Sequence, residues 1–199
     1  MVTQLTGFTD AVHDAQQTFR ALLDALARPG IPQTTTVSPT VPDGLMSSCA
    51  AACLTLLDLE TLVWLQPGLS DDIRSWLGFH TGCRFTSNPD AANFALIWDI
   101  VNAPDLQDFS WGSAEYPEAS TSLLVQLPRL TGGATVQLQG PGILQNIDVN
   151  LPVGARFWQQ WEAMTHDYPL GLDCWCFAQG QLIGIPRTSK LVINSREVA

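Results

Sequence analysis

The chain has 199 residues, of which 46% are hydrophobic and 14% are charged, and its nineteen acidic residues against nine Lys and Arg leave a net charge of −10. This balance excludes a basic stripe, so neither nucleic acid nor an anionic membrane surface is an expected partner. The length suits a single domain over residues 1–199.

The first predicted element is an amphipathic helix, because apolar residues recur at helical spacing. Those residues are Val12, Ala15, Phe19, Leu22, Leu23 and Leu26. Thr9 or Asp10 would cap this helix, and Pro29-Gly30 would end it. A Thr-rich strand is expected next, over residues 33–37.

A buried helix is predicted over residues 45–59, because this segment is apolar on nearly all sides. Residues 61–65 form the next expected strand. Ser70 would cap a short helix after it, with acidic residues in the first turn, where the helix dipole favours them. Residues 94–98 form a further strand.

One long polar loop is expected over residues 102–119. Residues 121–127 and 134–139 are predicted strands that flank Gly132-Gly133, so we expect them to pair as a hairpin. Residues 143–149 would extend the same sheet.

A last helix is predicted from Pro152 to about Asp167, since proline is favoured in the first helical turn. Residues 174–178 and 182–185 would form the closing hairpin, because Gly180 supplies the backbone freedom of a tight turn.

Strands and helices therefore interleave, and some strands are linked as hairpins. Pro186 ends the last of these strands, because proline cannot donate to a ladder. The fold class that this order predicts is α/β, with a mixed β-sheet flanked by helices on both faces as a three-layer sandwich.

Five cysteines occur without a secretory context, and the chain starts with no basic or apolar leader. We therefore expect reduced thiols in a cytoplasmic protein. Cys174 and Cys176 would point to one face of a strand, and Cys49 and Cys53 lie one helical turn apart. Together they would offer four thiolates to zinc, but neither spacing is the usual Cys-x-x-Cys, and both pairs lie in core-like segments. No metal is expected.

His80 and Cys83 suggest two interpretations. They would form a thiolate–imidazole nucleophile, or His80 would only make a hydrogen bond at a turn from helix to strand. The second interpretation is favoured. Arg187 follows a strand end, where open α/β sheets bind ligands, and Asp173 is its expected partner across the hairpin. The alternative for this pair is a structural salt bridge.

Two glycine-rich segments could form a phosphate cradle, Gly132-Gly133 and Gly140-Pro141-Gly142. A phosphate loop needs a lysine and a helix start directly after it, and neither follows here. Tight turns are the expected role of both segments.

The low charge content is consistent with a surface that a partner covers, or with a large core beneath a Thr, Gln and Asn surface. Of the seven tryptophans, Trp76 and Trp111 are the expected candidates for an exposed contact.

Several segments, in this order and spacing, resemble one known family. They are Asp14-Ala15-Gln16, Phe19-Arg20, Leu22-Leu23, Pro29-Gly30, Phe79-His80-Thr81, Gly140-Pro141-Gly142-Ile143, Tyr168-Pro169-Leu170-Gly171-Leu172-Asp173 and Ile185-Pro186-Arg187-Thr188. The chain resembles the H subunit family of bacterial carbon–phosphorus lyase (PhnH) over roughly residues 14–188. Pro141 and Cys83 depart from the family pattern.

The resemblance implies the fold of pyridoxal-phosphate-dependent transferases without the cofactor. Lys190 is the only lysine, and it lies beyond the last expected strand, so no Schiff base is expected and no cofactor. The resemblance also implies a homodimer that is built into a core complex with the G, I and J subunits. That system couples methylphosphonate to the ribose of ATP, with loss of adenine, and gives ribose 1-methylphosphonate 5-triphosphate.

Three functions are left open. The favoured one is an accessory subunit of this lyase and transferase system, without turnover of its own. The second is an enzyme that contributes His80, Asp173 and Arg187 to an active site shared with partners. The third and weakest is a stand-alone metal-dependent hydrolase.

Overall fold

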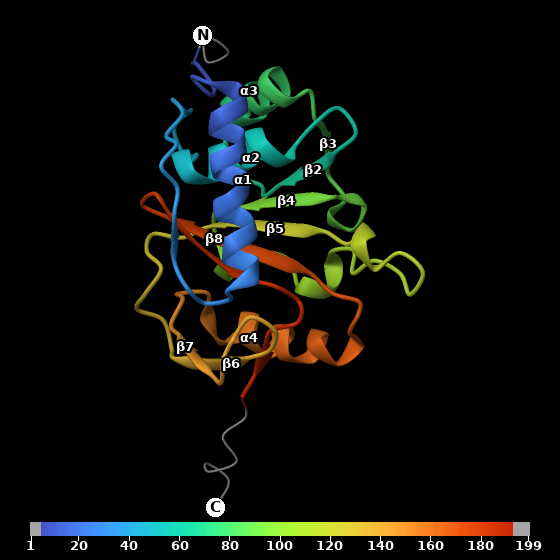
Figure 1. Ribbon diagram of the computed structural model, residues 1–199. Helices are drawn as coiled ribbons and strands as arrows, with labels where there is room; N and C mark the ends of the chain where they lie inside the picture. The colour runs from blue at the N-terminus through green and yellow to red at the C-terminus, as the bar shows by residue number, and fades with distance from the viewer. Residues whose placement is uncertain (1–4, 193–199) are drawn as a thin grey trace, which may run out of the picture.

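The computed structural model describes residues 5–192, and its fold is α/β with a mixed sheet (Figure 1), as the sequence predicts. Seven strands form the main sheet in the order β1-β9-β8-β5-β4-β2-β3. They are β1 (Gln33–Thr34), β2 (Leu62–Leu65), β3 (Arg84–Thr86), β4 (Phe94–Ile97), β5 (Ser122–Gln126), β8 (Asp173–Ala178) and β9 (Gln181–Ile185). Strands β8, β5, β4, β2 and β3 are parallel, and β9 runs antiparallel to β8.

Three helices pack on one face of this sheet, namely α1 (Ala11–Ala27), α2 (Ser47–Leu56) and α3 (Asp71–Thr81). Their predicted positions are confirmed. The Asp10 side chain caps α1 by accepting the Val12 and His13 N–H groups, as its residue type favours. Gly82 ends α3 with a φ of 72°, the left-handed conformation that glycine adopts without strain.

The other face is covered by α4 (Gly154–Met164) and by a second sheet of three strands in the order β10-β6-β7. These strands are β6 (Val136–Gln139), β7 (Ile147–Val149) and β10 (Lys190–Leu191). Short 3-10 helices complete this face and the loops: η2 (Pro89–Ala91), η3 (Ile100–Asn102), η4 (Leu106–Asp108), η5 (Pro117–Ala119) and η6 (Thr165–Asp167). Alternate residues of the strands belong to two separate hydrophobic cores, one on each face of the sheet. Trp64 and Cys176 lie in the core on the α4 side, and Val63 and Phe177 lie in the core on the α1 side.

The predicted hairpin of residues 121–127 with 134–139 is wrong. β5 pairs in parallel with β4 and β8, whereas β6 pairs with β7 and β10 in the small sheet. The burial pattern gives the reason, because Leu123, Leu124 and Val125 are all buried, as in a central strand covered on both faces. β3 was not predicted, since it has only three residues and begins with an exposed arginine.

The closing hairpin of β8 and β9 is confirmed, with Gly180 at a φ of 78° in its turn and Pro186 directly after its second strand. β9 also carries α1. The backbone of α1 approaches Gly184 so closely that a methyl group there would lie 2.5 Å from the carbonyl carbon of Ala25. Within residues 5–192, no helix combines the length and the apolar character that crossing a bilayer requires.

Candidate functional site

Arg187 and Asp173 form the predicted ion pair, in which Arg187 Nη2 lies 2.6 Å from Asp173 Oδ2. The Nε group donates to the same oxygen, and the backbone N–H of Arg187 donates to Asp173 Oδ1. Nη2 also donates to Ser120 Oγ at 2.6 Å, and Nη1 donates to the carbonyl oxygens of Pro117 at 2.7 Å and Pro169 at 3.4 Å. A guanidinium has five N–H donors, so these partners occupy all of them.

This cluster, which we call the Arg187 clasp, joins the start of β8 to the end of β9 and to two loops. It leaves no donor free for an anionic substrate. It also lies at the amino edge of the parallel strands, because Asp173 begins β8. Open α/β sheets bind ligands at the opposite, carboxyl edge. A catalytic role for Asp173 and Arg187 stays a prediction, and the geometry favours a structural one.

His80 lies half-buried in the last turn of α3. Its Nε2 is 3.0 Å from the carbonyl oxygen of Leu5, and Trp76 Nε1 donates to the same oxygen at 3.3 Å. Trp76, a predicted exposed contact, is instead fully buried, because its ring packs in the core while its N–H reaches this carbonyl. His80 and Trp76 thus fix the segment that precedes α1 against α3.

A nucleophilic pair of His80 and Cys83 is not supported. The Nε2 of His80 is engaged by Leu5, and the Cys83 N–H donates to the Thr81 hydroxyl. Burial raises the pKa of the Cys83 thiol, which disfavours the thiolate that a nucleophile needs.

Replacing His80 with glutamine tests whether this side chain acts as an anchor. A glutamine amide also donates a hydrogen bond, so we expect His80→Gln to unfold within about 1 kcal/mol of the unchanged chain, measured by urea denaturation. His80→Ala, which leaves the part-buried Leu5 carbonyl with one donor fewer, is expected to lose about 1–2 kcal/mol. Equal losses in the two variants would contradict the anchoring role.

The fold does not bring the three candidate residues together. His80 precedes β3, whereas Asp173 begins β8, and β2, β4 and β5 lie between these two strands. Four inter-strand spacings of about 4.8 Å separate them by roughly 19 Å. Within one chain, His80 and the Arg187 clasp therefore belong to separate regions.

The carboxyl edge, where this class of sheet usually binds ligands, is filled by protein groups. The chain passes to the α1 side of the sheet after β2 and to the α4 side after β4. Ligands of open α/β sheets usually bind in the crevice between two such strands. Gln66 is buried there, and its Oε1 accepts the N–H groups of Trp98 at 3.0 Å and Asp99 at 2.9 Å. The Trp98 indole donates to the Pro67 carbonyl and covers Gly68, where a methyl group would meet it at 2.9 Å.

Sequence reasoning missed this arrangement, although a signal was present: Gln66 is a polar residue directly after the apolar β2, and Gln126 is the polar last residue of β5. Gln126 is also buried, and it binds the loop before α2 through Gly44 and the N–H of Met46. Trp98 is 46% exposed. Both glutamines satisfy loop backbone groups, so neither is available to a substrate.

The four candidate zinc ligands cannot meet at one ion, because the main sheet separates them. Cys49 and Cys53 belong to the core on the α1 side, and Cys174 and Cys176 belong to the core on the α4 side, with their Sγ atoms 3.8 Å apart. Burial raises the pKa of the Cys49 thiol, and the hydrogen bond with Cys176, together with burial, raises that of Cys174. Over residues 5–192, no other group of three metal-ligating side chains gathers.

Lys190 does not fit a pyridoxal-phosphate site. It was expected beyond the last strand, but it lies in β10, exposed and opposite Gln139. An exposed lysine on the small sheet has no enclosed pocket for a Schiff base. The glycine segments lie in turns, as predicted. Gly142 also lies close to the Ala27 carbonyl, which leaves no room for a side chain.

Comparisons with known proteins find a family model and relatives that match this chain. The family model described as bacterial phosphonate metabolism protein (PhnH) matches residues 6–192. The chain is similar to the alpha-D-ribose 1-methylphosphonate 5-triphosphate synthase subunit PhnH of Rhizobium meliloti (strain 1021), with 37% identity over 187 residues that cover 92% of this chain and 93% of that protein. It is also similar to the putative C-P lyase subunit protein HtxG of Stutzerimonas stutzeri, with 27% identity over 88% of this chain and 85% of that protein.

Proposed function

Because the chain belongs to the family of the bacterial phosphonate metabolism protein PhnH, we propose that it is a subunit of a carbon–phosphorus lyase system. In that system it supports the formation of ribose 1-methylphosphonate 5-triphosphate from ATP and methylphosphonate. The observation that carries this proposal is the similarity over nearly the whole length of both chains to a protein named as a subunit of that synthase.

An accessory role, without turnover by the isolated chain, is the form of this function that the geometry supports best. All donors of Arg187 are occupied by protein groups, and Gln66 and Trp98 fill the carboxyl edge of the sheet. A triphosphate needs cations or helix N-termini, and this chain offers nine Lys and Arg against nineteen acidic residues. The phosphates of ATP are therefore expected to be held by sister subunits.

A shared active site is the second candidate, and one cavity favours it. A 490 Å³ cavity open to the surface is lined by Phe8, Phe79 and His80, among others, so groups of a docked subunit would reach the imidazole there. In this alternative His80 contributes to a site that partners complete, and Asp173 with Arg187 contributes to another part of the assembly.

The remaining family traits are proposed with the function. They are a homodimer, assembly with the G, I and J subunits, a cytoplasmic location, and a single α/β domain over residues 1–199. We extend the fold proposal to the three-layer arrangement of pyridoxal-phosphate-dependent transferases. The seven-stranded mixed sheet with β9 as its antiparallel member supports it, with helices on one face and α4 on the other.

Growth on methylphosphonate as sole phosphorus source tests the accessory role. We expect His80→Gln and His80→Ala to grow in proportion to the amount of complex that co-purifies with each, because neither removes a reacting group. Full assembly with lost growth in both variants would favour the shared active site. Release of adenine from ATP and methylphosphonate by the purified chain alone would overturn the accessory role.

A further inference from the structure

The 490 Å³ cavity opens at the amino end of α1, between the segment that leads into this helix and the last turn of α3. Figure 1 shows these two parts of the chain side by side at one end of the molecule. The walls of the cavity include Phe8 and Phe79, with Gly7 and His80 beside them. We call this space the Phe79 cavity. Its size falls within the usual range of small-molecule pockets, about 300–1,000 Å³.

Aromatic rings form one wall of the Phe79 cavity. Phe79 is 64% exposed, and its ring lies edge to face with that of His80, with 5.0 Å between the ring centroids. The buried Trp76 ring packs against His80 from the core, at a centroid distance of 4.7 Å, and holds the imidazole in place. Planar ring systems stack on aromatic faces of this kind. The ligand that this wall favours is therefore flat and aromatic.

One nitrogen of His80 is left as a hydrogen-bond acceptor in the cavity. A carbonyl oxygen can only accept, so the Nε2 atom that lies 3.0 Å from the Leu5 carbonyl oxygen carries the proton. Nδ1 of the neutral ring then has a lone pair, which receives no hydrogen bond from residues 5–192. Gly7 keeps the space beside this atom open, because a methyl group on residue 7 would lie 3.0 Å from Nδ1. A ligand that donates an N–H group would use this acceptor.

The segment before α1 adds backbone donors and acceptors. The N–H and C=O groups of Thr6, Gly7 and Phe8 make no hydrogen bond to any other group of the part of the chain that the structure describes. None of the described residues that line the cavity is Asp, Glu, Lys or Arg, so a charged ligand would find no balancing charge there. The cavity thus suits a neutral ring that both donates and accepts hydrogen bonds.

We propose that the Phe79 cavity binds a purine base with an exocyclic amino group, which donates to His80 Nδ1 while the ring stacks on Phe79. The ring nitrogens then meet the free backbone groups of residues 6–8. This inference rests on the proposed function, because ATP carries such a base and the proposed reaction releases it as adenine. His80 binds the base and takes no part in breaking a bond.

The division of ATP between subunits follows from the charges of the chain. This chain holds the neutral base, and the sister subunits hold the triphosphate, for which nine Lys and Arg against nineteen acidic residues are a poor match. Binding through the triphosphate continues without the hydrogen bond to Nδ1. The growth of the His80 variants is therefore still expected to follow the amount of complex.

Histidine resonances test the site on the full chain. The sequence has three histidines, so a chain labelled with 15N-histidine gives a small set of imidazole signals in nuclear magnetic resonance. We expect adenosine, a neutral probe, to move the Nδ1 signal of His80 to saturation and to leave those of His13 and His166 in place, since neither lines the cavity. Inosine has an oxygen in place of the amino group and is expected to bind at least about 10-fold more weakly. An unmoved His80 signal at the solubility limit of adenosine, or equal binding of the two nucleosides, would overturn the proposal.

Two glycine substitutions separate an effect at Nδ1 from a general effect of an added methyl group. Gly7→Ala places a methyl group against Nδ1, whereas Gly78→Ala, in the helix that carries His80, places one 3.6 Å from the Phe85 ring and outside the cavity lining. We expect Gly7→Ala to weaken adenosine binding at least about 10-fold, because the acceptor is covered. Gly78→Ala is expected to bind adenosine like the unchanged chain. Equal affinities of the two variants would overturn the role of Nδ1.

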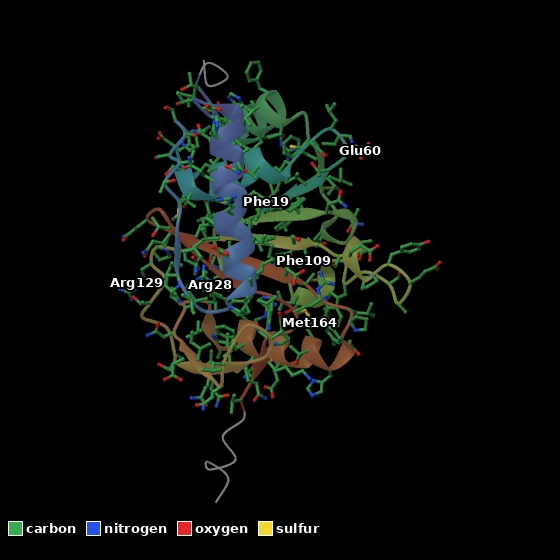
Figure 2. The ribbon with its side chains drawn as sticks, viewed as in Figure 1. Phe19, Arg28, Glu60, Phe109, Arg129 and Met164 are labelled. Carbon is green, nitrogen blue, oxygen red and sulfur yellow. The ribbon has the colours of Figure 1, made fainter. Side chains whose placement is uncertain are left out.

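A second pair of variants tests the aromatic wall. Phe79→Leu keeps an apolar side chain but removes the aromatic face, so we expect adenosine to bind at least about 5-fold more weakly. The control is Phe19→Leu, because Phe19 is 51% exposed and lies midway along α1, away from the cavity at its amino end (Figure 2). Both side chains are exposed, so both variants are expected to fold. Undiminished binding by Phe79→Leu would overturn the stacking.

Failure of the base site can be told apart from failure of the proposed function. A chain that binds no adenosine, yet co-purifies with sister subunits and supports growth on methylphosphonate, overturns the base site and leaves the subunit role intact. A chain that binds adenosine at His80 but binds no sister subunit supports the base site and contradicts the subunit role.

Discussion

Replacing Arg187 with lysine is expected to lower the free energy of unfolding by about 3 kcal/mol, the largest loss that we predict for one charged side chain here. Both partners of the ion pair are largely buried, with side-chain exposures of 13% for Arg187 and 22% for Asp173. An ammonium group has three donors and no planar fork, so it cannot bind Asp173, Ser120, Pro117 and Pro169 together. The carboxylate and at least one buried oxygen would then lose their partners. Urea denaturation followed by circular dichroism measures the effect.

Arg156 provides the matched control for this experiment. Its Nη2 also lies 2.6 Å from a carboxylate, that of Asp105, but its side chain is 57% exposed. Exposed ion pairs contribute about 0–1 kcal/mol, so Arg156→Lys should change stability by less than that. If Arg187→Lys were as mild as Arg156→Lys, the Arg187 clasp would not hold the four segments, and its guanidinium would be available for a functional role.

A single methyl group on Gly184 is expected to lower the free energy of unfolding by about 3 kcal/mol, at the upper end of the range for overpacking. The added carbon of Gly184→Ala would lie 2.5 Å from the carbonyl carbon of Ala25 and 2.6 Å from its oxygen. These are backbone atoms of α1, and no rotation of a side chain relieves the contact. α1 must therefore move away from β9. We expect a lower midpoint of urea unfolding.

Gly78 supplies the opposite case. It lies inside α3, and a methyl group there would meet nothing closer than the Phe85 ring at 3.6 Å. Alanine is favoured over glycine by about 1 kcal/mol within a helix, so Gly78→Ala should raise stability or leave it unchanged. A Gly184→Ala chain as stable as Gly78→Ala would show that α1 can shift on the sheet without cost.

The Arg187 clasp and the filled carboxyl edge explain why this α/β protein acts as part of an assembly in the function that we propose. Both regions contain polar side chains at positions where an enzyme of similar architecture could bind a ligand. Here Gln66, Gln126 and Arg187 bind the protein's own backbone and loops instead. Exposed apolar side chains also occur on α1, where Val12, Phe19 and Leu23 are exposed.

Most helices and strands of this protein were determined by the sequence itself, because their signals are local. Each of these signals depends on neighbours within a few positions. Examples are the helical spacing of apolar residues over 11–27, the apolar run of α2 and the Gly180 turn. The pairing of Asp173 with Arg187 was also predicted, since a hairpin of known turn brings its two ends together.

Only the tertiary structure decided which strands became neighbours and which side chains were left free. β5 and β6 are close in sequence but lie in different sheets, because parallel pairing depends on contacts between distant segments that no local pattern encodes. The same holds for His80, whose partner is 75 residues away at Leu5, and for Trp76, which packing buried against expectation. Burial depends on how the layers assemble, which the sequence does not show directly. The sequence therefore identified the candidate residues, and the tertiary structure showed that other groups of the protein already occupy their hydrogen-bonding atoms.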